Sequence, residues 1–283
     1  MRKLVNCTVP LALGLCAFVA LGLVLSIVAA IAFRGVPALS WRFFTEQIRL
    51  VGADGGIFFN LVGTGVLILT ALAVTTPLAV GLALLHGVYL KTESARRRLM
   101  LALYVLNGVP SILFGILGLI VFVKYFHWGK SWLAGGILLG LMILPTVAIS
   151  LAERIATLPR KYLEAAAGLG LTQSQIIWSV ILPQTRSGLI TGALLGLARA
   201  AGETAPIMFT ATIFAGATLP HAIKESPVLS LPYHIFILAQ DSFDPSVGTK
   251  LWGTALVLLM MVCVLSAIAL PMRLRTHEEA HHG

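Results

Sequence analysis

The sequence predicts an all-α integral membrane protein with six transmembrane helices. Hydrophobic residues make up 58% of the 283 positions and charged residues only 11%, and the mean hydropathy is +0.95. A chain this apolar cannot stay dissolved as a monomer, which excludes a soluble globular protein. Six runs also reach the length of about 20 mostly apolar residues that a helix needs to cross roughly 30 Å of hydrocarbon.

The six expected spans cover residues 10–33, 61–85, 101–123, 133–151, 188–215 and 252–270. The first resembles a signal peptide, but it is longer than the roughly 7 to 15 apolar residues of a cleavable one, so we expect it to be retained. We divide the chain into an N-terminal helix with its outer loop (1–60), a transmembrane core (61–272) that contains a cytoplasmic loop (152–187), and a cytoplasmic tail (273–283).

The distribution of basic residues predicts that both termini lie in the cytoplasm. With that orientation, 12 of the 20 Lys and Arg residues lie inside, seven lie outside and one, Arg199, lies within the fifth span. The excess on the inner side follows the positive-inside rule. Trp41, Trp128, Trp132 and Trp252 then lie near the outer interface, where the amphipathic indole ring is stable.

Neither nucleic acid nor a metal is expected as a partner. The formal net charge of +9 carries little information in a membrane protein, because the position of each Lys and Arg relative to the spans matters more than their sum. Cys7, Cys16 and Cys263 show no CxxC spacing, so we expect neither a disulfide nor a metal site from them.

The loop before the fifth span, "YLEAAAGLGLTQSQIIWSVILP", predicts two short helices separated by a glycine turn. Pro159 suits a first helical turn, and Gly168 and Gly170 can supply the left-handed residue that ends it. Thr172 and Gln175 form a capping box that opens the second helix.

The second helix is expected to present an apolar face and to break at Pro183. The first would present small side chains at Ala165, Ala166 and Ala167, surrounded by Arg160, Lys161 and Glu164. Two interpretations remain open on composition: a docking surface for another protein, or an amphipathic linker on the membrane surface.

The fifth span carries two charges, Arg199 and Glu203, which we expect to pair because they are four residues apart on one helix. Counted from the start of the span at 188, Arg199 lies about 17 Å into the membrane, near its midplane. A lone charge there costs at least about 2.5 to 3.5 kcal/mol. Gly188, Gly192 and Gly196 fall on the same helical stripe.

Two interpretations of this stripe are open. It is either a packing seam with an internal ion pair, or part of a translocation path in which the guanidinium compensates an oxyanion. We favour the path, because ionisable groups within a membrane span usually serve function. Pro206 leaves the carbonyl of Gly202 without its usual partner, which predicts a kink beside the pair.

The loop pattern resembles the EAA loop of ABC importer permeases. The matching residues are Glu164, Ala165 and Ala166, then Gly170 after three residues, and Val180, Ile181, Leu182 and Pro183 after nine more. The resemblance implies the type I importer permease fold, in which the short helix is a coupling helix that docks on a cytoplasmic ATPase. This chain has no Walker sequence, so ATP would bind to that partner, and we expect neither enzyme activity nor a cofactor in this chain.

"RAAGETAP" from Arg199, "GVPSILFGILGL" from Gly108 and "SLPYHIF" from Ser230 resemble phosphate-specific, PstA-type permeases. The resemblance implies an importer in the bacterial inner membrane with a PstC-type sister permease, a PstB-type ATPase dimer and a PstS-type external phosphate-binding protein. It places Arg199 and Glu203 on the substrate path. His86 and Gly87 depart from the family pattern, which often has an acidic residue here. The alternatives are a permease for sulfate or molybdate and an ion-coupled secondary transporter.

Overall fold

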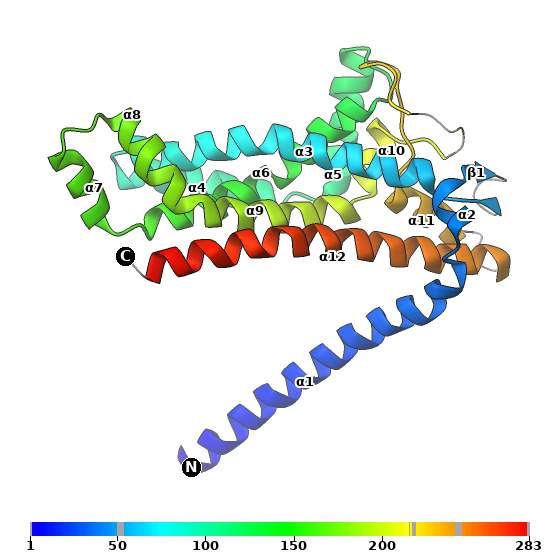
Figure 1. Ribbon diagram of the computed structural model, residues 1–283, viewed down its shortest axis with the longest axis horizontal. Coiled ribbons are helices and arrows are strands. Elements are labelled where there is room, and N and C mark those ends of the chain that lie inside the picture. Colours follow the sequence, from blue (N-terminus) through cyan, green and yellow to red (C-terminus); the bar gives the residue numbers. More distant parts are fainter. Residues whose placement is uncertain (1, 50–53, 215, 217–218, 241–244, 282–283) are drawn as a thin grey trace.

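The computed structural model describes residues 2–49, 54–214, 216, 219–240 and 245–281, and those residues form an elongated bundle of helices with one small hairpin. Side chains are described from residue 10 to residue 268, apart from those at positions 241–246 and in the remaining gaps. The helical fold confirms the all-α part of the predicted fold class (Figure 1).

The long helices are α1 (Arg2–Gly35), α3 (Phe58–Leu84), α4 (Glu93–Asn107), α6 (Trp132–Ala156), α9 (Leu182–Gly202) and α12 (Pro245–His281). The shorter ones are α2 (Trp41–Thr45), α5 (Ser111–Gly118), α7 (Arg160–Gly168), α8 (Gln173–Ile176), α10 (Ala205–Thr210) and α11 (Leu231–Gln240). Strands β1 (Ile48–Arg49) and β2 (Asp54–Gly55) pair antiparallel.

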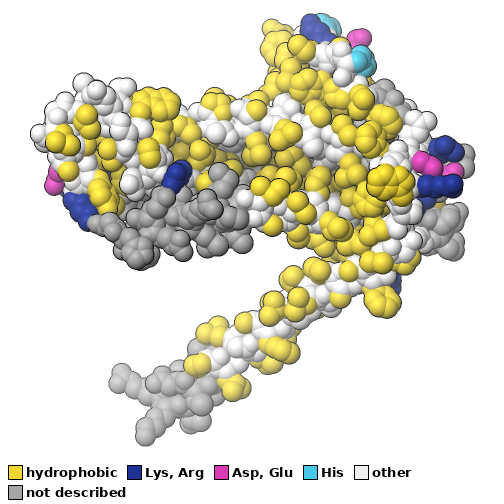
Figure 2. Space-filling model, in the orientation of Figure 1, with side chains coloured by type: hydrophobic (Ala, Val, Ile, Leu, Met, Phe, Trp, Pro, Cys, Tyr) yellow, Lys and Arg dark blue, Asp and Glu magenta, His cyan; other side chains and the backbone are white. Residues whose placement is uncertain are grey.

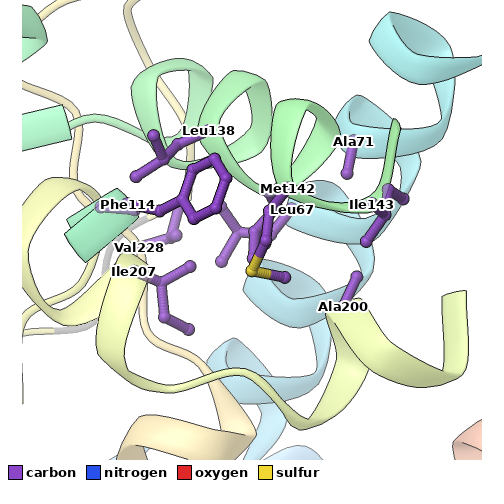
Figure 3. Close-up of a cluster of buried hydrophobic side chains, with 11 residues drawn as sticks. Leu67, Ala71, Phe114, Leu138, Met142, Ile143, Ala200, Ile207 and Val228 are labelled. Atoms are coloured by element: carbon purple, nitrogen blue, oxygen red, sulfur yellow. The ribbon is translucent and has the colours of Figure 1, made fainter. Parts of the chain in front are cut away.

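Helix α6 forms the centre of the bundle, with α3 parallel to it and α9 antiparallel. Small residues bring the backbones together. A Cβ atom at Gly136 would lie 2.5 Å from the Cβ of Thr70 in α3, and one at Gly140 would lie 3.0 Å from the carbonyl oxygen of Ala71. Figure 3 shows the main apolar cluster, where α6 side chains meet Phe114 of α5 and Ile207 of α10.

Four expected spans are continuous apolar helices long enough to cross a membrane. They correspond to the segments Pro10–Ala38, Phe58–Tyr89, Trp132–Ala156 and Val247–Ile268. Three prolines of the membrane segments, Pro10, Pro77 and Pro145, lie inside these helices without ending them. Neighbouring helices can compensate for the lost backbone hydrogen bonds in this setting.

The expected span at 101–123 is not one continuous helix. Helices α4 and α5 instead meet at an angle of 88°. The break lies in the sequence "NGVP", where Pro110 lacks the N–H group that would continue α4 and occupies the position before α5. Because proline also disfavours helical backbone at the residue before it, α4 ends at Asn107.

The expected continuous span at 188–215 is also wrong. Helix α9 starts six residues earlier, at Leu182, and ends at Gly202, where Glu203 takes extended backbone angles. Helix α10 then begins at Ala205 with Pro206 in its first turn. Gly at the end of one helix and Pro at the start of the next are typical of two separate helices, so the predicted kink is a full break.

Helix α1 diverges from the bundle and contacts it only near its C-terminal end (Figure 1). There, a Cβ atom on Gly35 would lie 2.6 Å from the carbonyl oxygen of Trp252 in α12. The side chains from Pro10 to Ala30 are all exposed, and apolar ones cover the helix along its length (Figure 2). This surface faces lipid or other apolar groups when the chain is in a membrane.

The two ends of the bundle differ from its middle in composition. Charged side chains gather at the two ends and at the tip of the part that projects at the top of the view, while yellow apolar side chains dominate between them (Figure 2). Helices α7 and α8 lie at the end toward which both described chain ends point, and the hairpin, α2 and α11 lie at the other (Figure 1). The polar ends and apolar waist fit a protein that crosses a bilayer.

Candidate functional site

Arg199 and Glu203 lie together where α9 ends. The Arg199 Nε atom is 3.7 Å from the Glu203 Oε1 atom, and the two side chains are 30% and 18% exposed. Arg199 is in the last turn of α9, where the negative end of the helix dipole stabilises a cation. The guanidinium is therefore compensated on one side and still accessible on another.

Asn107 is a third polar residue of this site, and the sequence interpretation missed it. Arg199 Nη1 donates a 2.7 Å hydrogen bond to Asn107 Oδ1, and the Thr146 hydroxyl donates a 3.1 Å hydrogen bond to the same oxygen. Asn107 is the last residue of α4. A polar amide directly before "GVP" in an apolar run was the signal that could have identified it.

The site lies level with the middle of α6. A Cβ atom on Gly196, one turn before Arg199, would lie 3.2 Å from Val147 and 3.3 Å from Ile143, both central residues of α6. Thr146 lies in the same turn of α6. A guanidinium, a carboxylate and an amide therefore share a partly accessible position far from both ends of the bundle.

The three glycines of the predicted stripe face α6. Cβ atoms on Gly188 and Gly192 would lie 2.5 Å from Arg154 Cβ and 3.0 Å from Val147 Cα, respectively. Gly192 and Gly196 are buried. In this conformation the stripe is filled by α6, so the glycines serve close helix packing, while Arg199 extends beyond the packed part.

Replacing Gly192 with leucine is expected to destabilise the protein by about 1 to 3 kcal/mol, because the added side chain must push α9 away from the α6 backbone. Thermal unfolding of the purified chain in detergent measures the loss. Gly81→Leu in α3 is the matched control, since a Cβ atom there has no neighbour within 4 Å. Equal effects of the two substitutions would contradict the packing role.

On the far side of the helix break, Lys130 holds the end of α10. Its Nζ atom donates hydrogen bonds of 2.9 and 3.0 Å to the carbonyl oxygens of Met208 and Thr212. Burial lowers the pKa of Lys130 from its ordinary value. The ammonium group thus fixes the short helix that follows Arg199 and Glu203.

The loop between α6 and α9 contains the two short helices that the sequence predicts. Helix α7 starts directly after Pro159, and Gly170 has the left-handed φ of +76° that ends the turn. The Thr172 hydroxyl accepts from the Gln175 backbone N–H, and the Gln175 side chain accepts from the Thr172 backbone N–H, which completes the expected capping box.

The expected break at Pro183 is wrong. Helix α8 continues through a π-helical turn (Ile177–Ile181) directly into α9. The Leu182 N–H group bonds to the carbonyl oxygen of Ile177, five residues back. This wider turn moves the preceding carbonyls out of register, so the proline ring is accommodated at the start of α9.

The surface of α7 differs in one respect from the predicted small-residue face. Ala166 is only 4% exposed, whereas Ala165, Ala167 and the charged residues Arg160, Lys161 and Glu164 are exposed. Two large apolar side chains nearby, Leu169 and Trp178, are 81% and 71% exposed. The outer face of this loop is therefore a mixed small, charged and apolar surface.

The inner face of the loop is fixed to the bundle. Ile177 and Ile181 pack with Leu151 and Ile155 of α6 in one buried cluster, and Leu163 of α7 packs against it. These contacts join α7 and the π-helical turn to the central helix α6.

Comparison with known proteins identifies the family. Residues 75–276 match the family described as "Binding-protein-dependent transport system inner membrane component". The chain belongs to this family.

Several relatives of this transport-system component extend over most of its length. It is 31% identical to the phosphate transport system permease protein PstA 2 of Mycobacterium tuberculosis, over 93% of this chain and 86% of that protein. It is 34% identical to a probable phosphate transport system permease protein PstA of Methanocaldococcus jannaschii, over 87% and 85%. It is 27% identical to the probable ABC transporter permease YqgI of Bacillus subtilis, over 90% of each.

The fold of the transport-system component is also known from solved structures. An inward-facing structure of the MetNI methionine ABC transporter aligns with a TM-score of 0.56 over 78% of this chain and 94% of that one, at 16% identity. This likeness confirms the expected ABC importer permease fold. The helix break beside Arg199 and the loop that carries α7 therefore both belong to a membrane component of a transport system.

Proposed function

We propose that this chain is the membrane-spanning permease subunit of an ATP-driven inorganic phosphate importer. The observation that carries the proposal is the triad of Arg199, Glu203 and Asn107 at mid-bundle depth. A partly exposed guanidinium supplies a planar fork of donors for an oxyanion. The PstA names of its relatives supply the substrate class.

In the proposed cycle, Glu203 holds Arg199 when no anion is present. An entering phosphate replaces Glu203 as the partner of the guanidinium, and Asn107 keeps the Arg199 side chain oriented. The nearby carboxylate also limits how tightly the anion binds, because a site for transport must release what it binds. The extended backbone between α9 and α10 lets the two helices move separately.

The same proposal assigns the partners. A sister permease supplies the other half of the path, an external binding protein delivers phosphate, and two copies of a cytoplasmic ATPase dock on the exposed face of α7. ATP is bound by those ATPase subunits. The orientation places α7 and both termini in the cytoplasm of a cell with this chain in its inner membrane, which agrees with the excess of Lys and Arg on that side.

The test is ATP-dependent uptake of radiolabelled phosphate into vesicles that contain the four-part complex. We expect uptake that requires this chain, the ATPase and the binding protein. Unlabelled sulfate and molybdate are added as competitors. If unlabelled sulfate or molybdate reduced the uptake of radiolabelled phosphate more than unlabelled phosphate did, the substrate assignment would be wrong. Transport by the purified chain alone would contradict the whole proposal and favour an ion-coupled carrier.

A further inference from the structure

A cavity of about 240 Å³ that is open to the surface lies between the cytoplasmic ends of α6 and α9, well away from Arg199. Its lining includes the Arg154 side chain, the hydroxyl-bearing Ser150, Thr157, Ser187 and Thr191, and the carboxylate-bearing Glu153. The hydroxyls of Ser150 and Thr157 already donate to the carbonyl oxygens of Gly188 and Arg154. The guanidinium and the hydroxyls of Ser187 and Thr191 are the donors that suit an oxyanion.

Arg154 has no side-chain partner among the described residues. Its aliphatic stem packs against Gly188, where an added Cβ atom would lie 2.5 Å from the Arg154 Cβ. No hydrogen bond or ion pair to its guanidinium joins it to any other described group. The stem is therefore fixed by the helix seam, while the charged head is free to bind an anion.

A ladder of polar residues connects this cavity with the site at Arg199. Thr146, Ser150 and Arg154 are spaced four residues apart on α6, so they lie on one face. The Thr146 hydroxyl bonds to the same Asn107 oxygen that binds Arg199. From Thr146 to Arg154 the helix rises about 12 Å, which is the distance from mid-bundle to its cytoplasmic end.

The seam between the two sites is closed in this conformation. The Ser150 hydroxyl donates a 3.1 Å hydrogen bond to the carbonyl oxygen of Gly188 on α9, and the glycines pack against α6. Separation of α9 from α6 would break this bond and join the ladder to the cavity. Glu153, which is exposed at the cavity, opposes anion binding and so favours release.

We propose that the Arg154 cavity is an inner binding station for an inorganic oxyanion, occupied after Arg199 and before release into the cytoplasm. This inference rests on the proposed function for its substrate, phosphate. The station is assigned by a guanidinium that has no partner among the described residues, by the Ser187 and Thr191 hydroxyls beside it and by the ladder that leads to it.

The test is protection of a cysteine at the cavity by inorganic phosphate. In the assembled complex, Cys7, Cys16 and Cys263 are replaced by alanine and Thr191 by cysteine, and a cationic thiol reagent is applied from the cytoplasmic side. Phosphate is compared with chloride at equal ionic strength, which removes differences in screening. Ala156→Cys is the matched control, since it is exposed on α6 and does not line the cavity.

We expect phosphate to slow modification at position 191 and not at position 156. Arg154→Gln should raise the phosphate concentration needed for half-maximal protection about tenfold, which corresponds to the loss of one charge-assisted hydrogen bond. Arg154→Lys should retain most of the protection. The equivalent change Arg97→Gln, on the exposed side of α4, should have no effect. Absence of protection, or equal protection at both cysteines, would overturn the station.

A failure of the substrate assignment has a different signature. If sulfate or molybdate protects position 191 through Arg154 while phosphate does not, and uptake shows the same preference, the proposed substrate is wrong and the station stands. Protection that is unchanged in Arg154→Gln would show that the anion binds elsewhere, which contradicts the inference whatever the substrate.

Discussion

Replacing Arg199 with glutamine is expected to lower ATP-dependent phosphate uptake about a hundredfold or more, while the four-part complex still assembles. Glutamine retains a polar side chain but loses the charge-assisted bonds to the anion, each worth about 1.5 to 3 kcal/mol. It also leaves Glu203 without its 3.7 Å partner, and the free carboxylate repels an entering anion. Uptake of radiolabelled phosphate and the yield of the purified complex are measured together.

The double variant Arg199→Gln/Glu203→Gln separates a transport role from a structural one. If the pair serves only to stabilise the bundle, removing both charges should restore the complex and its uptake, because neither is left uncompensated. If Arg199 binds the anion, assembly should be normal and uptake should remain lost. Full uptake by either variant would contradict the transport role and show that Arg199 and Glu203 serve helix packing only.

Residues that are close along one helix were the part of the site that the sequence could predict. A spacing of four residues predicts the pairing of Arg199 with Glu203, and the pair forms although Glu203 takes extended backbone angles just past the end of α9. Spacing along the sequence also predicts the capping box of Thr172 and Gln175, which are only three residues apart. Such geometry is set by backbone periodicity and requires no knowledge of the fold.

Contacts between distant segments could not be predicted in this way. Asn107 is 92 residues from Arg199, and its role depends on an 88° bend that brings the end of α4 to α9. The proline in "NGVP" signals a break in a helix but not its angle. Helix α5 packs closely on both α10 and α6, and periodicity along the chain contains no information about such contacts.

Burial of α7 shows a similar limit. The sequence has three consecutive alanines, and all three were predicted to lie on a small, exposed face. Only Ala166 turns toward the body of the protein. The nine-residue helix is amphipathic, with Leu163 and Ala166 on one face, but its sequence does not say what that face packs against. Its rotation is instead set by the buried cluster that joins Leu163 and Ile177 to α6.

Replacing Ala165 with arginine on the exposed face of α7 is expected to reduce recovery of the ATPase with the membrane subunits at least about tenfold. Because Ala165 is exposed, a long side chain clashes with nothing in this chain and the fold should be unaffected. A closely packed interface, in contrast, loses about 1 to 3 kcal/mol when it must accommodate added bulk. Co-purification and phosphate-dependent ATP hydrolysis measure the effect.

The control for this prediction adds the same charge and bulk elsewhere at the end of the bundle where α7 lies. Ser94→Arg on α4 is suitable, since Ser94 is also exposed and lies outside the loop. It should leave ATPase recovery and uptake unchanged. Ala166→Arg should instead unfold the loop, because that side chain is buried. An Ala165→Arg complex that retains its ATPase and its uptake would show that this face of α7 is not the docking surface, because a closely packed interface could not accommodate the added side chain without loss.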